Sequence, residues 1–232
     1  MDMYVLIVAG GKGLRMGGDL PKQFIPMRGK PLLMHTLEAF HRWDASARII
    51  LVLPEDHQPY WNMLCKEIGC KVPHAIVKGG DTRFFSVKNG LDWLLAERRR
   101  KGEEDSGLSL VAVHDGVRPF VSPEVVEACF DKAAVTGAVI PVVPMIDSLR
   151  ETDEKGSHPV DRSRYMAVQT PQVFLLELLT KAYEQPYSSL FTDDASVVEA
   201  MGHAIDTVPG DRENIKITTP FDLLIAEAMF AR

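Results

Sequence analysis

Apolar runs without polar alternation recur along the chain and alternate with stretches of helical periodicity. A continuous apolar run is typical of a strand that is buried on both faces of a parallel sheet. Stretches in which apolar residues recur every three or four positions predict helices that cover such a sheet. We therefore expect an α/β fold built on a doubly wound, mostly parallel sheet. The expected strands are residues 4–8, 48–53, 75–77, 108–113 and 138–143, with a further short strand at 215–218.

Helix-start signals support the expected helices. Ser122 precedes Pro123, and Thr219 precedes Pro220, as an N-cap precedes the first helical turn. Thr192 is the expected N-cap of another helix, and Thr192, Asp193 and Asp194 together are expected to serve as helix-capping residues. The expected helices are residues 31–43, 60–68, 83–100, 123–134, 175–183, 193–201 and 221–230.

The alternation breaks at residues 145–168, which are polar and rich in turn residues. The segment Asp153-Glu154-Lys155-Gly156 is a hairpin signal, and residues 147–152 and 166–170 are candidate strands. A stretch of this length without a core-facing period is expected to protrude from the domain or to have a function.

Composition limits the class of protein. The 232 residues suit one large α/β domain or two small ones, and we expect a single domain over 1–232. A formal net charge of −6 argues against a general nucleic-acid binder, so an anion would have to be bound by a local group of cations. The cysteines Cys65, Cys70 and Cys129 do not form a zinc pattern and suit reduced thiols in the cytoplasm. No apolar run reaches the roughly 18 residues of a membrane-spanning helix, so no membrane association is expected.

The first expected strand leads directly into the glycine-rich segment Ala9-Gly10-Gly11-Lys12-Gly13-Leu14-Arg15-Met16-Gly17, and Lys22 follows shortly after. Glycines let backbone N–H groups approach a phosphate closely, and Arg15 and Lys22 add positive charge. Met16 stands where the dinucleotide fingerprint needs its third glycine, and the Gly-Lys-Ser/Thr of the P-loop is missing. These departures argue against a dehydrogenase and against a P-loop ATPase.

Three loops are expected at the carboxyl ends of strands, where open α/β sheets bind their ligands. They are residues 10–22, 79–86 and 114–118, and each carries glycine or charge. Their coincidence predicts a nucleoside triphosphate site at this edge of the sheet.

Several motifs together resemble the 2-C-methyl-D-erythritol 4-phosphate cytidylyltransferases of the non-mevalonate isoprenoid pathway, and the resemblance runs nearly end to end. These motifs are the glycine-rich segment above, Pro21-Lys22-Gln23, Gly79-Gly80-Asp81-Thr82-Arg83-Phe84-Phe85-Ser86-Val87, Val113-His114-Asp115-Gly116-Val117-Arg118-Pro119, Thr170-Pro171-Gln172, Thr192-Asp193-Asp194-Ala195-Ser196 and Asn214-Ile215-Lys216-Ile217-Thr218. Glycine-rich loops alone are shared by many nucleotidyltransferases, so the specificity lies in the combination.

The resemblance implies a Rossmann-like nucleotidyltransferase fold, transfer of CMP from CTP to a sugar-alcohol phosphate, release of pyrophosphate and a need for Mg²⁺. It assigns Arg15 and Lys22 to the triphosphate and the transition state. It also implies that residues 145–168 form a β-arm that clasps a second subunit, so that Arg162 acts in the neighbour's site of a homodimer. The implied nucleotide-binding residues are Ala9, Gly10, Gly11, Gly13, Gly80, Asp81, Ser86, Asp115, Gly116 and Arg118; the implied acceptor-binding residues are Asp115, Ser148, Arg162 and Lys216, and Asp115 is the implied metal ligand.

Two positions depart from the common family pattern: Gly116-Val117 replaces two alanines, and Ser148 replaces a threonine while keeping the hydroxyl. Neither change removes a charge. Two other functions stay open. A ribitol 5-phosphate cytidylyltransferase resembles the same fold and loops, and a non-catalytic protein would bind CTP without releasing pyrophosphate.

The implied chemistry explains the choice of residues. A phosphate monoester is mostly dianionic at neutral pH, so it attacks without a general base, and the barrier is the meeting of two anions. Several candidates also have purely structural interpretations. Asp81 is a possible N-cap, Asp115 a turn former, and His114 a packing residue. Arg162 has Asp161 and Glu151 as possible partners, whereas Lys216 lies in an apolar segment where an unpaired lysine is unfavourable.

Overall fold

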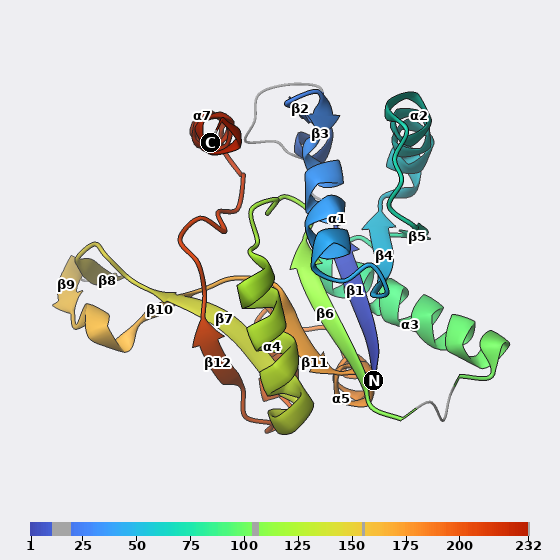
Figure 1. Ribbon diagram of the computed structural model, residues 1–232. Helices are drawn as coiled ribbons and strands as arrows, with labels where there is room; N and C mark the ends of the chain where they lie inside the picture. Colours follow the sequence, from blue (N-terminus) through green and yellow to red (C-terminus); the bar gives the residue numbers. More distant parts are fainter. Residues whose placement is uncertain (11–19, 104–106, 155, 232) are drawn as a thin grey trace.

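An eight-stranded, mostly parallel sheet forms the centre of the computed structural model, which describes residues 1–10, 20–103, 107–154 and 156–231 (Figure 1). The strands run in the order β10 (Met166–Val168), β7 (Ala138–Pro144), β11 (Gln172–Leu175), β6 (Ser109–Asp115), β1 (Asp2–Val8), β4 (Arg48–Leu53) and β5 (His74–Lys78), and β12 (Asp206–Pro209) lies along β7. The pairs of β1 with β4 and β6, of β4 with β5 and of β7 with β12 are parallel. Only β10 and β11 pair antiparallel with their neighbours in this sheet, so the predicted sheet type is confirmed.

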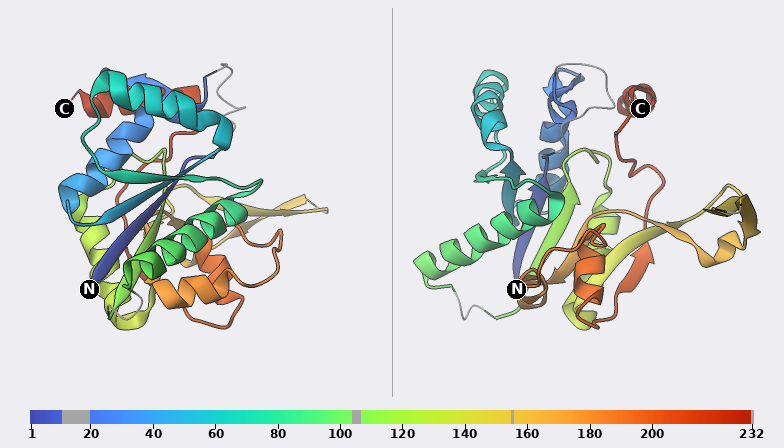
Figure 2. Two further views of the ribbon diagram at one scale, coloured as in Figure 1. Left: turned by 90° about the vertical axis from the view of Figure 1, so that its right-hand side faces the viewer. Right: turned by 180° about the vertical axis from the view of Figure 1, so that it is seen from behind.

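Helices cover both faces of the sheet (Figure 2). One apolar cluster joins the sheet to α1 (Leu32–Trp43), α2 (Gln58–Ile68) and α4 (Pro123–Thr136). The other joins it to α3 (Arg83–Lys101), α5 (Leu176–Ala182) and α6 (Asp194–Glu199). The helix α7 (Pro220–Phe230) packs elsewhere, with Met27, Leu32 and Val117 in a smaller cluster.

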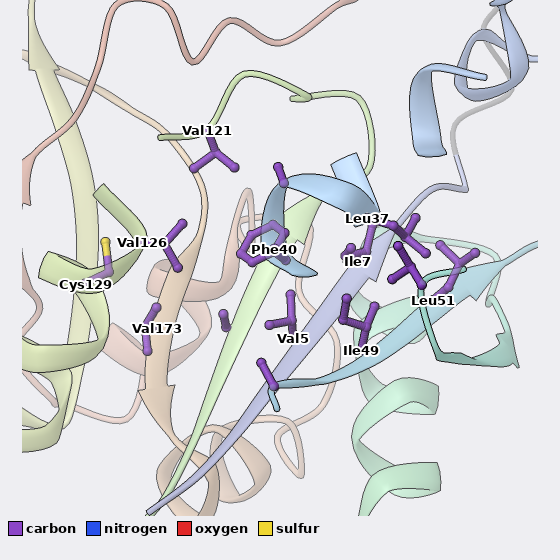
Figure 3. Close-up of a cluster of buried hydrophobic side chains, with 14 of the residues drawn as sticks. Val5, Ile7, Leu37, Phe40, Ile49, Leu51, Val121, Val126, Cys129 and Val173 are labelled. Carbon is purple, nitrogen blue, oxygen red and sulfur yellow. The ribbon is translucent and has the colours of Figure 1, made fainter. Parts of the chain in front are cut away.

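Strand β1 shows why its sequence is continuously apolar. Successive side chains of a strand point to opposite faces. Val5 and Ile7 lie in the cluster with Leu37 and Phe40 of α1 (Figure 3), whereas Tyr4 and Leu6 lie in the cluster on the opposite face. Both faces of this strand are therefore core.

A hairpin projects from the body of the molecule (Figure 1). Strands β8 (Leu149–Asp153) and β9 (Gly156–Val160) pair antiparallel, and the 3-10 turn η4 (Arg162–Arg164) follows them before the chain re-enters the sheet at β10. The hairpin predicted from residues 153–156 is confirmed, and we call residues 145–168 the arm. Most of its side chains are exposed, because no other described segment covers them.

Short elements complete the fold: η2 (Lys22–Phe24), the two-residue strands β2 (Pro26–Met27) and β3 (Lys30–Pro31), and η3 (Glu55–His57). None of the helices in the described residues has the length and apolar character needed to cross a membrane.

Two expectations about elements were wrong, and two strands of the structure were missed. Residues 215–218 are irregular rather than a strand, and β11 and β12 were not expected. Asp193, not Thr192, is the N-cap of α6, and its side chain accepts a hydrogen bond from the Ser196 N–H in a capping box. Strands β11 and β12 have four residues each and hold their place through pairing with β6 and β7, which a local sequence pattern does not reveal.

Candidate active site

The register of the sheet brings the expected loops together. Val8 is opposite Val52 and Asp115, and Leu53 is opposite Lys78, so β1, β4, β5 and β6 end at one edge. The ladder continues for one residue beyond these ends: the Gly79 N–H donates to Leu53 O and the Gly116 N–H to Val8 O. Residues that follow these strands therefore emerge side by side, as the sequence predicted.

A cavity opens at this edge. Its wall contains eight of the residues that the sequence singled out: Ala9, Gly10, Lys22, Gly80, Asp81, Ser86, Asp115 and Lys216. The remaining wall residues are Val8, Gln23, Thr82, Arg83 and Val117. The expected residues Gly11, Gly13 and Arg15 lie outside the described residues. Two lysines and two carboxylates thus face one space beside a strand end.

Lys22 is held in place by its neighbours in η2. The Gln23 side chain donates a 3.0 Å hydrogen bond from Nε2 to Ala9 O and lies 3.2 Å from His57 Nδ1. The buried Phe24 ring packs against Tyr60 and Trp61 of α2. Anchored on both sides, this turn places Lys22 on the cavity wall.

The segment 79–86 is a compact turn before α3. Ser86 Oγ donates to Thr82 O at 2.9 Å and accepts from the Gly80 N–H at 3.1 Å. Thr82 is the N-cap of α3, so the alternative that Asp81 caps this helix was wrong. The Asp81 carboxylate is exposed on the cavity wall instead.

Asp115 is the centre of a buried ionic network. Its Oδ2 lies 3.0 Å from Lys216 Nζ and 3.1 Å from Arg118 Nε, and Arg118 Nη1 donates to Asn214 O at 2.7 Å. Burial by itself would raise the pKa of this carboxyl, but the charges of Lys216, Arg83 and Arg118 hold it below its ordinary value. Asp115 is therefore ionised and positions Lys216. Lys216 lies in an irregular segment rather than in a strand. Arg118 contacts the cavity only through Asp115.

His114 lies behind Asp115 and is fully buried. Its Nε2 lies 3.1 Å from Arg118 O, an acceptor, so Nε2 carries the proton and Nδ1 accepts from the Thr170 hydroxyl at 3.1 Å. Burial lowers the pKa of His114 to about 4. The imidazole is a neutral internal hydrogen-bonding group, consistent with a packing residue.

The buried His114 makes the stability of the fold depend on pH. Its pKa falls from 6.5 to about 4 on folding, so between these pH values the unfolded chain binds a proton that the native chain does not. This contribution is complete above pH 6.5 and is lost as the pH falls towards 4, by about 3 kcal/mol in total. We expect urea unfolding of a His114→Gln variant to show a flatter pH dependence than the unchanged chain over this window. Parallel curves would contradict the assignment.

Some expected residues are not on the cavity wall. Gly116 lies just behind it, where an added Cβ would be 2.8 Å from the Ala9 Cβ. Ser148 and Arg162 are exposed on the arm. Neither expected partner of Arg162 pairs with it in the described residues: its Nη1 donates to Ile146 O, Glu151 contacts His158, and Asp161 accepts from Ser163.

Sequence reasoning did not single out Arg83, although it lines the cavity. Its position offers a signal. Arg83 is the first residue of α3, where the helix dipole disfavours a cation. Its guanidinium forms a two-pronged pair with the buried Asp194. A cation placed against the dipole indicates a role other than helix stability.

A larger cavity, of about 910 Å³, lies at the other end of the sheet beside α3 and α5. None of the expected site residues lines it. The concentration of expected residues at the strand ends therefore identifies the smaller cavity as the candidate active site.

Comparisons with known proteins identify a family for the chain. The model of the 2-C-methyl-D-erythritol 4-phosphate cytidylyltransferase family matches residues 3–232. The chain is 56% identical over 229 residues to the protein of that name from Bacteroides fragilis, covering 99% of this chain and 100% of the relative. Among solved structures, the enzyme of that name from Thermus thermophilus has a TM-score of 0.74 at 32% identity, covering 100% of this chain and 100% of that chain. The 4-diphosphocytidyl-2C-methyl-D-erythritol synthase from Anaerococcus prevotii has a TM-score of 0.79 at 28% identity, covering 100% of this chain and 96% of that chain. The chain therefore belongs to the 2-C-methyl-D-erythritol 4-phosphate cytidylyltransferase family.

Proposed function

We propose that this protein transfers CMP from CTP to 2-C-methyl-D-erythritol 4-phosphate and releases pyrophosphate. The observation that carries the proposal is the meeting of Lys22, Lys216 and Asp115 with the glycine-rich strand end in one cavity of a chain of this family. A dehydrogenase would need the dinucleotide fingerprint that Met16 interrupts.

The chemistry needs positioning and positive charge. A phosphate oxygen of the acceptor attacks the α-phosphorus of CTP, the new O–P bond forms, and the bond from the α-phosphorus to the bridging oxygen of pyrophosphate breaks. Negative charge grows on the α-phosphoryl oxygens and on the leaving group. We assign Lys22, with Arg15, to this charge, and Lys216 to the acceptor phosphate. Asp115 holds Lys216 by the 3.0 Å ion pair.

We assign the nucleotide to the wall formed by Ala9, Gly10, Gly80, Asp81 and Ser86, with Gly11 and Gly13 continuing the glycine-rich segment. Main-chain N–H groups at such a strand end suit phosphate oxygens. The Asp81 carboxylate is an acceptor suited to the amino group of a cytosine. We assign Asp115 to the ribose, with Gly116 and Arg118 supporting it from behind the cavity wall.

The residues present fit a magnesium ion that arrives with the triphosphate. No group of three His, Cys, Asp or Glu side chains gathers in the described ranges, as a dedicated protein cage would require. Mg²⁺ is commonly held by one or two carboxylates together with substrate phosphates. Asp115, which is ionised, is the carboxylate on the cavity wall that would hold it together with the phosphate oxygens. Bound there, the ion would offset charge on the phosphate oxygens.

We further propose that residues 1–232 act as one domain, and that the arm over 145–168 joins two copies in a homodimer. Ile146, Tyr165 and Met166 are 60%, 45% and 47% exposed, which is apolar surface suited to a partner. Ser148 and Arg162 would then complete the neighbour's cavity. The free thiols of Cys65, Cys70 and Cys129 suit a reducing cytoplasm.

The test is pyrophosphate release from CTP and Mg²⁺ with 2-C-methyl-D-erythritol 4-phosphate, run beside ribitol 5-phosphate. We expect release with the first acceptor alone. Release of pyrophosphate with ribitol 5-phosphate alone would contradict the proposed acceptor. CTP binding without pyrophosphate release would favour the non-catalytic alternative. Mixing Arg162→Ala and Lys22→Ala chains tests the arm, because a shared site would restore activity in the mixed dimer.

Gly80→Ala is expected to weaken CTP binding. An added Cβ would lie 2.4 Å from the Phe85 Cβ and 2.9 Å from the Phe85 carbonyl carbon. Because backbone is involved, the segment 79–86 must shift away from its place beside the nucleotide. We expect the dissociation constant for CTP, measured by calorimetry, to rise about tenfold. An unchanged constant in a variant with an unchanged circular dichroism spectrum would remove this segment from the CTP site.

A further inference from the structure

The motifs Thr170-Pro171-Gln172 and Thr192-Asp193-Asp194-Ala195-Ser196 have no part in the chemistry above. They nevertheless contact each other and the site. In the Thr170-Pro171-Gln172 motif, Thr170 Oγ1 accepts from the Asp115 N–H at 3.1 Å. Gln172 Oε1 accepts from the Ala195 N–H at 2.9 Å, and its Nε2 donates to Asp193 at 2.8 Å. Gln172 therefore contacts the start of α6, which lies in the second motif, and Thr170 contacts the backbone of Asp115.

The next residue, Asp194, reaches the nucleotide segment. Arg83 Nη1 lies 2.9 Å from Asp194 Oδ1, and Arg83 Nη2 lies 2.5 Å from Oδ2. The Tyr183 hydroxyl donates to Asp194 Oδ1 at 2.6 Å. Asp194 is completely buried, whereas the Arg83 side chain is 29% exposed at the cavity.

The ion pair between Arg83 and Asp194 is not explained by the stability of the fold alone. Desolvation of a buried ion pair offsets most of its Coulomb energy, and a well-packed apolar pair is often as stable. Arg83 is also at the unfavourable end of the α3 dipole. What the pair does provide is geometry, because a guanidinium and a carboxylate in two-pronged contact allow one orientation.

The same geometry argues against direct phosphate binding by Arg83. Both of its Nη atoms contact Asp194, so its charge is offset by a carboxylate rather than presented to the ligand. The backbone that it fixes is the start of α3. Three residues further on, Ser86 bonds to Gly80 and Thr82 and closes the turn that carries Asp81.

We propose that Arg83, Asp194 and Tyr183 form a positioning clamp that orders segment 79–86 for CTP. The clamp rests on the proposed function only in taking CTP as the nucleotide. It joins residues 111 apart in the chain, and so attaches the nucleotide wall to α5 and α6. Arg83 is a positioning residue here, and the motif containing Asp194 is explained by its contact with Arg83.

The experiment compares Asp194→Asn and Arg83→Lys with the unchanged chain. Asn keeps the shape of Asp194 without its charge, and Lys keeps the charge of Arg83 without the two-pronged contact. We expect the dissociation constant and KM for CTP to rise roughly tenfold to a hundredfold, with kcat at saturation and KM for the acceptor changed by less than about threefold. The double variant Arg83→Lys/Asp194→Asn is expected to be no weaker than the worse single variant, because the pair acts as a unit.

Arg48→Gln is the matched control. Arg48 forms a similar two-pronged pair with Glu103, away from the cavity, so its loss should leave the KM for CTP unchanged. If Asp194→Asn fails to fold, Tyr183→Phe removes a single hydrogen bond and should raise the KM for CTP by about twofold to fivefold.

Two results would overturn the clamp. One is a folded Asp194→Asn variant with an unchanged KM for CTP, which would make the pair purely structural. The other is an Arg83→Lys variant with lower kcat and unchanged KM, which would place Arg83 on the reacting phosphates. Calorimetry with CTP needs no acceptor and no turnover. It therefore tests the clamp even if the unchanged chain proves inactive with 2-C-methyl-D-erythritol 4-phosphate.

Discussion

Replacement of Lys22 by alanine is expected to lower kcat by roughly 100- to 1,000-fold, as loss of a preorganised group that stabilises transition-state charge does in other enzymes. Lys22 lies on the cavity wall, fixed by Gln23 and Phe24, which follow it in the same turn. Its charge is needed most when the α-phosphoryl oxygens and the pyrophosphate become more negative. The KM for CTP should rise much less than kcat falls. Steady-state measurement of pyrophosphate release separates the two effects.

Lys181→Ala is the control for this substitution. Lys181 is exposed on α5, outside the candidate active site, and should leave kcat unchanged. A Lys22→Ala variant with full kcat and raised KM would assign Lys22 to ground-state binding alone. A Lys22→Arg variant should recover part of kcat, because it keeps the positive charge on the same short helix.

Asp115→Ala is expected to reduce both stability and activity. Asp115 is 8% exposed and forms ion pairs with Arg118 and Lys216. Removing one partner leaves the other charge buried without compensation, which costs about 3–5 kcal/mol in comparable networks. Most of this effect should come from Arg118, whose side chain is only 11% exposed. Urea unfolding at neutral pH measures the loss.

Activity of Asp115→Ala should fall as well, because Lys216 loses the carboxylate that positions it. Asp92→Ala is the contrasting variant: Asp92 pairs with Lys88 on the surface of α3, and exposed pairs contribute little. Equal unfolding midpoints for Asp115→Ala and Asp92→Ala would refute the buried network. Asp115→Asn should be less destabilised than Asp115→Ala, since it can still accept from one cation.

Much of the fold was predictable from sequence because it depends on local patterns. The strand at residues 48–53 was predicted with the bounds that the structure has, and its buried apolar run is the reason. Ser122 and Thr219 were predicted as N-caps, and each accepts the expected backbone hydrogen bond. Such signals act over a few residues, so the sequence contains all the information they need.

The errors about strands share one cause. Residues 215–218 are apolar enough to suggest a strand, yet no strand in the described part of the chain pairs with them. Their one backbone hydrogen bond to the turn that follows β6 runs from the Ile217 N–H to Val117 O. The last residue of β11, Leu175, was read as the start of a helix, and its strand conformation comes from pairing with β6. Strand pairing depends on which strand edges lie nearby in the folded protein, and a local sequence pattern does not contain this information.

The site divides in the same way. The sequence by itself determined which loops end at the ligand-binding edge, because the alternation of strands and helices sets the direction of each parallel strand. It also identified the charged residues of those loops, including Lys22, Asp81 and Asp115. Only the tertiary structure decided which of them touch. Lys216 meets Asp115, and Arg83 meets Asp194 rather than a solvent-exposed partner, because sheet register and helix packing bring distant segments within 3.0 Å of one another.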